Sequence, residues 1–311
     1  MRLLRQLATP QAGTRGYVAA IGGFDGIHLG HRALIERARM LAHAQGLSSM
    51  VLTFEPLPKE FFAREQPPAR LTSLRERWRL LQADGPQVLA VLPFNARLRA
   101  HTAEQFAALL ARGGVRQIVI GHDFRAGYRG EASAGWFVEQ GARFGIATEV
   151  VAPVSGEGIR IGSGAIRDAL AAGDFARAEC LLGRPYSMRG RVIRGEQLGR
   201  QLGFPTANLR LARRRAPFDG IFAVRARDCS AGALAAWRDA VASLGTRPTV
   251  GGRTPLLEVH VFDFAGDLYG RELEVQFVAR LREELRFDNL DAMVEQMHRD
   301  AAAARAALAM S

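Results

Sequence analysis

The stretch AIGGFDGIHLGHRALIERA, residues 20–38, decides the fold of the first half of the chain. An apolar run leads into two glycines and then into the amphipathic pattern of a helix, with His28 and His31 at the predicted helix start. A helix that begins there aims its unpaired backbone N–H groups and the positive end of its dipole at the strand end, where phosphate is attracted. Four glycines let a nucleotide approach the backbone: Gly22, Gly23, Gly26 and Gly30. The two imidazoles can donate hydrogen bonds to a phosphoryl group whose charge is being redistributed.

Apolar runs and helical patterns alternate along the rest of the first half. Helical stretches separate the β-rich runs YVAAIGG (17–23), SSMVLTF (48–54), QVLAVLPF (87–94) and RQIVIG (116–121). This βαβ order predicts a parallel sheet with helices on both faces and ligands at the carboxyl ends of its strands.

The second half changes to short alternating runs with glycine and proline between them. These runs are RGRVIRG (189–195), GIFAVRARD (220–228), LLEVHVFDF (256–264) and ELEVQFVARL (272–281). Such runs predict an antiparallel barrel or sandwich. We place the boundary near Leu182–Arg184, which gives an α/β domain over 1–183 and a β domain over 184–311.

A terminal amphipathic helix is predicted within residues 287–308, with Asp288 or Asn289 as its cap. Its apolar stripe consists of Leu290, Met293, Val294 and Met297. Core packing is the usual role of such a stripe.

The composition is that of a globular protein of two domains. The chain has 311 residues, of which 48% are hydrophobic and 23% charged. No apolar run approaches the roughly 18 to 20 residues of a membrane span. Charged residues and a proline interrupt the first residues before a secretory core forms, so we expect a cytoplasmic protein. Cys180 and Cys229 stand alone, which indicates neither a disulfide framework nor a zinc site.

The formal net charge of +11 favours an anionic partner, either nucleic acid or small phosphorylated substrates. All basic residues except Lys59 are arginines, and they are scattered along the chain. The densest cluster, Arg210–Arg215, lacks the interleaved aromatic residues that stack on single strands, so no nucleic-acid partner is expected. Lys59 is followed by Glu60 rather than Ser or Thr, which excludes a kinase of the P-loop type.

A second helix start in the first half also suits phosphate. RIGSGAIRDAL (160–170) opens a helix at Ser163, with Arg167 one turn later. A serine at a helix start is commonly only a cap, so both interpretations of Ser163 stand. For His28 and His31 the alternative is a chance pair. A zinc site is disfavoured because no glutamate or third ligand accompanies the HxxH spacing.

The first half carries a family resemblance. GGFDGIHLGH (22–31) together with GSGAIR (162–167) resembles the HxGH nucleotidyltransferase superfamily. FEPLPKEFF (54–62) and GHDFRAG (121–127) make it similar to the flavin-nucleotide branch of that superfamily.

The second half extends this resemblance. GRVIRGEQLGRQLGFPTANL (190–209), GTRPT (245–249) and LEVHVFDFAGDLYG (257–270) resemble, motif by motif and in order, the riboflavin kinase module. From residue 18 to about residue 305, the chain therefore resembles the bacterial bifunctional riboflavin kinase/FAD synthetase family.

The resemblance implies that the second domain moves the γ-phosphoryl group of ATP to the 5′-hydroxyl of riboflavin. It implies that Thr206 and Asn208 hold Mg²⁺ and ATP, because a hard cation takes oxygen ligands, and that Glu258 is the general base. It further implies that Gly195, Gly199 and Gly203 shape the nucleotide loop, which has no Walker lysine. It also implies that Arg247 binds the flavin.

For the first domain the resemblance implies transfer of AMP from a second ATP to the FMN formed, with His28 and His31 at the ATP phosphates. The other implied ATP-binding residues are Gly22, Phe24, Asp25, Gly30, Ser163 and Arg167. The implied flavin-binding residues are Phe54, Pro56, Pro58, Phe62 and Asp123. Phe54 and Phe62 suit a flavin ring and equally a protein core.

Four residues depart from the family pattern: Gly162, Gly164, Ala126 and Ser243. Gly162 and Gly164 replace hydroxyl residues and Ala126 replaces an aromatic residue, so the first site loses hydrogen-bond donors and a stacking surface. Ser243 replaces an asparagine in the kinase half. Backbone N–H groups at the helix start can compensate in the first site, since they need no side chain.

The expected function is therefore the bifunctional one, with small-molecule substrates, no membrane partner and self-association left open. One alternative is a riboflavin kinase with a weakened adenylyltransferase. The other is a basic RNA-binding protein that keeps only the fold, which the intact Thr206, Asn208 and Glu258 disfavour.

Overall fold

Two compact units make up the chain in the computed structural model, which describes residues 1–8, 14–156, 158–195, 199, 202–231, 236–249 and 252–311. The first unit consists of Met1–Pro68 and Leu74–Gly162, and the second of Ala69–Ser73 and Ser163–Ser311. Residues 163–182 thus cluster with the second unit. The division into domains 1–183 and 184–311 stays a prediction.

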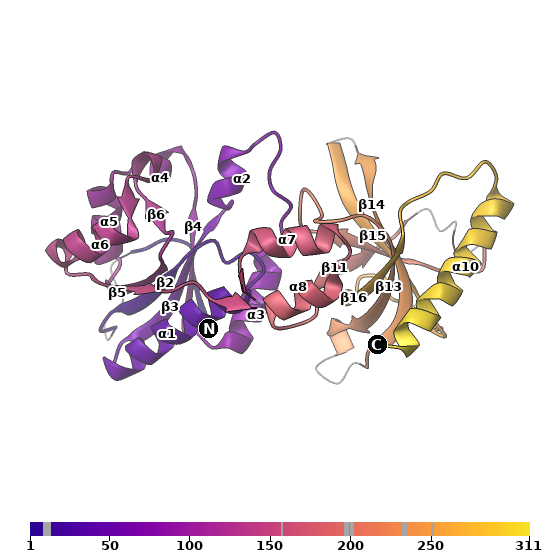
Figure 1. Cartoon of the computed structure of the whole chain (residues 1–311), viewed down its shortest axis with the longest axis horizontal. Helices are drawn as coiled ribbons and strands as arrows, with labels where there is room; N and C mark the ends of the chain where they lie inside the picture. Colours follow the sequence, from indigo (N-terminus) through magenta and orange to yellow (C-terminus); the bar gives the residue numbers. More distant parts are fainter. Residues whose placement is uncertain (9–13, 157, 196–198, 200–201, 232–235, 250–251) are drawn as a thin grey trace. The chain divides into compact units, whose positions relative to one another are not determined.

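A parallel sheet forms the middle of the first unit, as predicted (Figure 1). Its strands, in spatial order, are β1 (Arg2–Leu4), β4 (Val88–Pro93), β3 (Ser48–Glu55), β2 (Tyr17–Ile21), β5 (Val115–Gly121) and β8 (Ala147–Val151). The four central strands coincide with the four apolar runs and are largely buried. The edge strands β1 and β8 are short and partly exposed, which is why no apolar run marks them.

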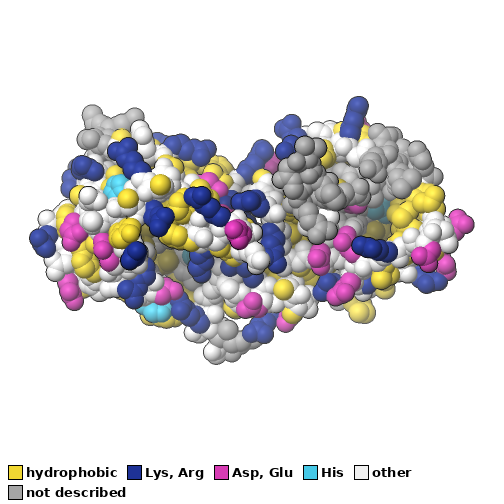
Figure 2. Space-filling model, turned by 90° about the horizontal axis from the view of Figure 1, so that it is seen from above, with side chains coloured by type: hydrophobic (Ala, Val, Ile, Leu, Met, Phe, Trp, Pro, Cys, Tyr) yellow, Lys and Arg dark blue, Asp and Glu magenta, His cyan; other side chains and the backbone are white. Residues whose placement is uncertain are grey.

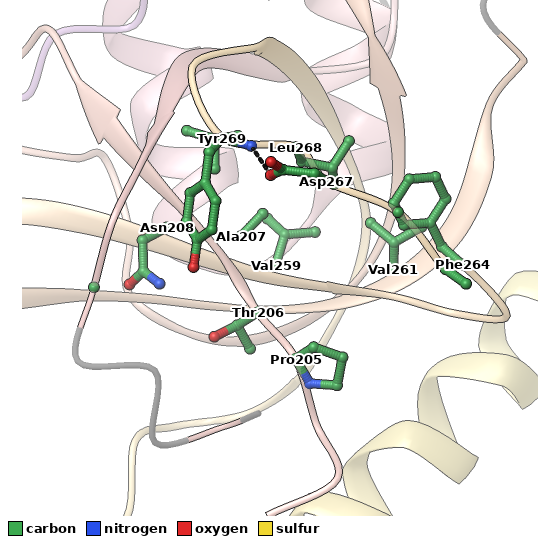
Figure 3. A pocket seen from close by; sticks show the side chains of 14 residues that line it. Pro205, Thr206, Ala207, Asn208, Val259, Val261, Phe264, Asp267, Leu268 and Tyr269 are labelled. Atoms are coloured by element: carbon green, nitrogen blue, oxygen red, sulfur yellow. Dashed lines mark hydrogen bonds between the residues drawn. The ribbon is translucent and has the colours of Figure 1, made fainter. Parts of the chain in front are cut away.

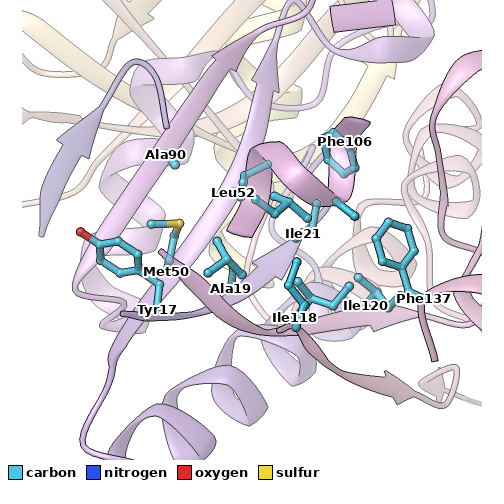
Figure 4. Packing of buried hydrophobic residues seen from close by; sticks show 14 of the residues in the cluster. Tyr17, Ala19, Ile21, Met50, Leu52, Ala90, Phe106, Ile118, Ile120 and Phe137 are labelled. Atoms are coloured by element: carbon cyan, nitrogen blue, oxygen red, sulfur yellow. The ribbon is translucent and has the colours of Figure 1, made fainter. Parts of the chain in front are cut away.

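Helices cover both faces of this sheet, because side chains alternate between its faces. Tyr17, Ala19 and Ile21 of β2 join the core that contains Phe106 and Phe137 (Figure 4). The intervening Val18 and Ala20 pack into the core on the other face. The helices of this unit are α1 (Leu29–Ala44), α2 (Pro58–Phe62), α3 (Leu74–Asp84), α4 (Ala96–Arg99), α5 (Ala103–Arg112) and α6 (Ala134–Gln140).

Short elements complete the first unit. The pairs β6 (Arg125–Ala126) with β7 (Ala132–Ser133) and β9 (Ser155–Gly156) with β10 (Ile159–Arg160) are antiparallel ladders of two residues each. Two 3₁₀ turns are η1 (Tyr128–Gly130) and η2 (Gly141–Phe144).

The second unit contains a closed antiparallel barrel, which decides between the barrel and the sandwich that the sequence leaves open. Its strands, in order around the barrel, are β11 (Ser187–Ile193), β12 (Ala207–Leu211), β15 (Gly252–Val261), β14 (Arg238–Thr249), β13 (Gly220–Asp228) and β16 (Glu272–Arg282). Closure leaves no unpaired sheet edge. The 3₁₀ turn η3 (Cys229–Ala231) follows β13.

Within the described residues, the helices that accompany the barrel are α7 (Ser163–Ala171), α8 (Phe175–Leu182) and α10 (Leu290–Ala309). Asn289 caps α10 through a 2.8 Å hydrogen bond from the backbone N–H of Ala292, one of the two predicted caps. The apolar stripe differs from its predicted role. Leu290 is 55% exposed and the other three residues of the stripe are half-buried, whereas the fully buried side chains of α10 lie in its second half, at Asp300, Ala304 and Leu308. No helix within the described ranges is both long and apolar enough to cross a membrane.

Candidate active sites

The two histidines lie at the start of α1, directly after the loop that follows β2, as predicted. His28 is the N-cap of α1, and its Nδ1 accepts a 3.2 Å hydrogen bond from the backbone N–H of His31. An accepting Nδ1 places the proton of a neutral His28 on Nε2. The two rings stack with centroids 3.6 Å apart, and the His31 ring also lies 5.0 Å from that of Phe24. The sequence therefore forms one compact imidazole pair at a helix start.

The loop before α1 adopts a rarely used backbone conformation. Phe24 and Ile27 have φ angles of 50° and 44°, and both side chains are fully buried. Such left-handed non-glycine residues cost about 1–3 kcal/mol each and cluster at functional sites. Asp25 between them is also buried. A Cβ on Gly30 would lie 3.2 Å from the His28 ring, so this glycine leaves space for the imidazole.

His31 is held in its neutral form. Burial, then the nearby His28, then the Arg77 guanidinium lower the pKa of His31 well below its usual range. Its Nδ1 is buried without a hydrogen-bond partner among the described residues. A neutral imidazole carries one N–H donor and no full positive charge, and the role of His31 at the ATP phosphates stays a prediction.

The residues that the resemblance assigns to flavin in the first unit lie at the end of β3 and beyond. Phe54 is buried in the core, and its ring meets that of Phe94 edge-on at 5.8 Å. Phe62 is 62% exposed on α2, 5.7 Å from the Phe94 ring. Pro56 follows a cis peptide bond, and Pro58 is the first residue of α2. Phe54 thus packs in the core, whereas Phe62 is exposed, and a flavin-binding role for either stays a prediction.

Asp123 follows β5 and is paired with Arg160, whose Nη2 donates a hydrogen bond of 2.5 Å to Oδ2. Partial burial alone raises the pKa of Asp123, but the hydrogen bond and charge of Arg160 outweigh it and lower the pKa overall. Asp123 is therefore an anion at neutral pH. Ala126, one of the departures from the family pattern, packs half-buried against the core in β6.

Ser163 and Arg167 belong to the second unit, in the first two turns of α7. The Arg167 guanidinium donates hydrogen bonds to the backbone oxygens of Ala69 (2.5 Å) and Ser163 (3.1 Å). These bonds fix the direction of the side chain. A Cβ on either Gly162 or Gly164 would meet nothing within 4 Å, so there is room for the hydroxyl side chains that the family pattern has there.

The barrel holds two cavities that share a border. One, of about 350 Å³, is lined by Thr206, Asn208, Asp267 and Tyr269 among others, and these side chains point into the same space (Figure 3). The backbone N–H of Tyr269 donates a 2.8 Å hydrogen bond to Asp267, which shapes the loop above it. The other cavity, of about 520 Å³, is lined by Thr206 and Asn208 again and by Glu258. Thr206 and Asn208 therefore face both cavities.

Three neighbouring strands bring polar side chains into one row beside these cavities. Glu258 of β15 is directly opposite Asn208 of β12 and directly opposite Ser243 of β14. Opposed residues on antiparallel strands place their side chains on the same face, about 4.5–5.5 Å apart at Cβ. Strands β14 and β15 are consecutive in the sequence and pair directly, whereas β12 lies beside β15 because of the barrel order β12-β15-β14, which sequence order does not reveal. Ser243, singled out only as a departure, thus neighbours the predicted base.

Two glycines of the predicted nucleotide loop pack closely against neighbouring residues, and one of them, Gly195, makes room for Asn208 of this row. A Cβ on Gly195 would lie 2.7 Å from Asn208 Nδ2, and a Cβ on Gly199 would lie 2.4 Å from the Phe204 carbonyl oxygen. Gly203 has a φ of 80°, which favours glycine. Residues 196–198 and 200–201 of this loop lie outside the described residues. The backbone of Arg247 pairs with Thr254 in β14, but its side chain lies outside the described part of the chain, so its flavin-binding role stays a prediction.

Residues that the sequence motifs did not mark also line these sites. His260, two residues after Glu258, borders the larger cavity, and its Nδ1 lies 2.9 Å from the Pro205 carbonyl oxygen. Arg77 of α3 is fully buried beside the β2–α1 loop. His260 lies within the quoted motif LEVHVFDFAGDLYG (257–270) but was assigned no role there, and Arg77 lies in none of the quoted motifs. The only sequence signal for His260 is its position two residues after Glu258, which puts both side chains on one face of a strand. For Arg77 the sequence gives no signal, because an arginine on a predicted helix does not by itself indicate a site.

Comparisons with known proteins agree on both units. A family described as FAD synthetase matches residues 11–165, and one described as riboflavin kinase matches residues 182–308. A curated bifunctional riboflavin kinase/FMN adenylyltransferase from Pseudomonas fluorescens is 43% identical over 100% of this chain and 99% of its own length. Its namesake from Escherichia coli (strain K12) is 40% identical over 98% of this chain and 97% of its own length.

A solved structure from Streptococcus pneumoniae, named a macrolide-efflux protein, is 30% identical with a TM-score of 0.78, covering 98% of this chain and 99% of that one. The likeness extends over both units. Two family matches and relatives of this identity over nearly the full length place the chain in one family. It belongs to the bifunctional riboflavin kinase/FMN adenylyltransferase family.

Proposed function

We propose that this chain makes FAD from riboflavin in two steps, one carried out by the residues of the barrel and the other by those around the histidine pair. As a member of the bifunctional family, it is a riboflavin kinase and an FMN adenylyltransferase. The observation that best supports the residue assignment is the row of Ser243, Glu258 and Asn208 beside two cavities that share Thr206 and Asn208.

In the kinase reaction, ATP occupies the cavity of about 350 Å³ and riboflavin the cavity of about 520 Å³, both of ordinary size for such ligands. The γ-phosphoryl group then lies beside Thr206 and Asn208. Glu258 accepts the proton of the 5′-hydroxyl while that oxygen bonds to the γ-phosphorus, and the bond to the bridging oxygen breaks to release ADP. In-line placement in two adjoining cavities supplies most of the catalysis, because phosphoryl transfer is largely a matter of positioning and charge stabilisation.

The donor set beside the γ-phosphoryl group fits Mg²⁺. The Thr206 hydroxyl and the Asn208 amide oxygen are hard oxygen ligands, and Mg²⁺ typically takes one or two protein oxygens together with phosphate oxygens and water. When bound there, the cation neutralises charge that develops on the phosphates. Thr206 and Asn208 would be the residues that hold it.

In the adenylyl transfer, His28, His31 and the N-terminus of α1 bind the triphosphate of the second ATP. A phosphate oxygen of FMN bonds to the α-phosphorus while the bond to the β-phosphate breaks, and pyrophosphate leaves. The imidazole donors and the helix dipole stabilise the charge on the departing pyrophosphate. No bond between protein and nucleotide is needed at any stage.

A pair of assays tests this proposal. Riboflavin with Mg-ATP is supplied in the first and FMN with Mg-ATP in the second, and FMN and FAD are separated by chromatography. We expect FMN followed by FAD in the first assay, and FAD with an equal amount of pyrophosphate in the second. FMN that accumulates with no FAD in either assay contradicts the bifunctional proposal and leaves a kinase with a weakened adenylyltransferase.

The RNA-binding alternative makes a different prediction, namely RNA affinity that falls steeply with salt and no turnover of riboflavin. The arginines that would form such a surface are spread over the viewed face among acidic side chains rather than gathered in a stripe (Figure 2). We propose small-molecule substrates in the cytoplasm, without a nucleic-acid partner. Self-association stays open.

A further inference from the structure

Arg77 of α3 is fully buried, an unusual place for a charged side chain. Burying a guanidinium is unfavourable unless it is paired and hydrogen-bonded. Its Nη2 donates a 2.5 Å hydrogen bond to Glu55 Oε2. Its Nη1 lies 3.1 Å from the Gly23 carbonyl oxygen and 3.2 Å from the Thr53 hydroxyl. The Thr53 hydroxyl in turn donates to the same Gly23 oxygen at 3.1 Å.

These partners lie at the carboxyl ends of two neighbouring strands. Gly23 follows β2 in the loop that leads to the histidine pair, whereas Glu55 is the last residue of β3 and precedes the Pro56 segment. Strands β2 and β3 are parallel neighbours, with Ile21 paired to Leu52. Ligands of parallel α/β sheets bind beyond these strand ends. One guanidinium therefore connects two separate loops at the ligand-binding edge of the sheet.

Stability alone does not explain an arginine at this position. Replacing a buried ion pair by well-packed apolar residues is often neutral or stabilising. A planar fork with several fixed donors is, however, well suited to hold separate acceptors in one mutual geometry, which no apolar side chain can do. The charge of Arg77 also contributes to the lowered pKa of His31, so the guanidinium acts on the imidazole pair as well.

We propose that Arg77 is a positioning residue for adenylyl transfer: it joins the β2 loop that binds ATP to the β3 loop that binds FMN, so that the two substrates meet in one geometry. This inference rests on the proposed function of the first unit. Arg77 contacts neither substrate. It acts through the Gly23 carbonyl and the Glu55 carboxylate.

The test uses the full chain with Arg77→Met and Arg77→Lys, and measures kcat and the KM values of ATP and FMN for FAD formation. Arg77→Met removes both the fork and the charge, and Arg77→Lys keeps the charge with a single donor group. We expect both KM values to rise and kcat to fall in Arg77→Met, with kcat/KM reduced on the order of 10- to 100-fold, the scale of a misplaced reactant. Arg77→Lys should recover part of this loss.

Riboflavin kinase activity of the same preparations reports whether the second unit is intact, because its residues lie there, and thermal unfolding of the full chain reports whether the first unit is folded. Arg37→Met is the matched control, since Arg37 of α1 forms a bidentate pair with Glu149 that has no part in either loop. We expect its FAD formation to match that of the original chain. If Arg77→Met does not fold, Arg77→Lys carries the test, with both KM values raised and the kinase unchanged.

Unchanged KM and kcat in both Arg77 variants would overturn the inference, as would a rise in the KM of only one substrate. A fall in kcat with both KM values unchanged, or a first unit that is unfolded in Arg77→Lys, would also overturn it, because either pattern indicates a purely structural role. A chain with native Arg77 that forms no FAD from FMN contradicts the proposed function instead, so the two failures are distinguishable.

Discussion

Asn208 and Glu258 are directly opposite each other across β12 and β15 of the barrel. The predicted cation ligand and the predicted base thus sit on one face of two hydrogen-bonded strands. Neither strand can shift register by one residue without turning its own side chain, Asn208 or Glu258, to the opposite face. The backbone ladder, rather than a flexible loop, fixes the distance between the two groups, which is the kind of rigid support that phosphoryl transfer needs.

The first prediction concerns Glu258→Gln. The amide keeps the size of the side chain but cannot accept the proton of the riboflavin hydroxyl, so kcat for FMN formation should fall by about 10²- to 10⁴-fold. Conversion of supplied FMN to FAD should continue at its original rate, because the histidine pair lies in the first unit. Chromatographic assays of both reactions check this. Equal loss of both activities would argue against separate sites.

A second prediction concerns His260, which lies 2.9 Å from the Pro205 carbonyl and 5.2 Å, ring to ring, from Phe204. We expect it to hold the peptide just before Thr206, so His260→Ala should raise the KM of ATP in the kinase reaction several-fold. His260→Asn should restore much of the affinity, because its amide can donate to the same carbonyl.

His298 provides the control for this experiment. Its ring meets Phe204 at 4.7 Å, yet no hydrogen bond to Pro205 is described for it. His298→Ala should therefore leave the KM of ATP close to its original value. A larger change in the KM of riboflavin than in that of ATP for His260→Ala would show that the imidazole serves the flavin instead.

The architecture of the first unit was predictable because its buried strands are continuous apolar runs. Between them lie helical patterns, which fixes a parallel arrangement. The barrel was less predictable from the sequence, since alternating runs suit a sandwich equally well. Strand β14 was also hard to recognise, because it contains Gly245 and Pro248, residues that usually mark turns. Closure depends on pairings between strands far apart in sequence, such as β11 with β16.

The candidate sites were predictable where residues stand together in a motif, as in the histidine pair and the Thr206–Asn208 segment. Arg77 was not predictable, because α3 looks like any charged amphipathic helix and only its packing shows that this arginine faces inward. The positions of His260 and Ser243 were likewise not predictable from the sequence alone. Their proximity to Glu258 or to the Pro205 peptide arises from strand register, which no local pattern encodes.

A third prediction tests the departures from the family pattern at the start of α7. A Cβ on Gly164 would meet nothing within 4 Å, so Gly164→Ser should be accommodated without strain. Serine is also a better helix residue than glycine, by a few tenths of a kcal/mol. We expect an unchanged or slightly higher unfolding temperature and a KM of ATP for FAD formation that falls severalfold, because a hydroxyl donor is restored. An unchanged KM in a normally folded variant would show that backbone N–H groups already compensate.

The last prediction concerns the pH dependence of barrel stability. Glu274 of β16 is buried and accepts hydrogen bonds from Ser187 (2.9 Å), Arg189 (2.6 Å) and Arg227 (2.6 and 2.9 Å). Burial alone raises the pKa of Glu274, but the two arginines and the hydroxyl outweigh it and lower the pKa below the usual 4.5. The folded state thus favours the ionised carboxylate. Its contribution to stability is present above the unfolded pKa and is lost as the pH falls through the lower folded value.

Glu274→Gln should therefore destabilise the barrel at pH 7 by about 3–5 kcal/mol, because two arginines lose the anion that they surround. The difference from the original chain should shrink as the pH falls below about 4.5, since Glu274 itself is then protonated. Thermal unfolding from pH 7 to pH 3, scored by the kinase activity that survives, measures this. Glu295→Gln is the control, because Glu295 forms an exposed pair with Arg299 on α10 and such pairs contribute little. A pH-independent difference for Glu274→Gln would show that its hydrogen bonds, rather than its charge, stabilise the barrel.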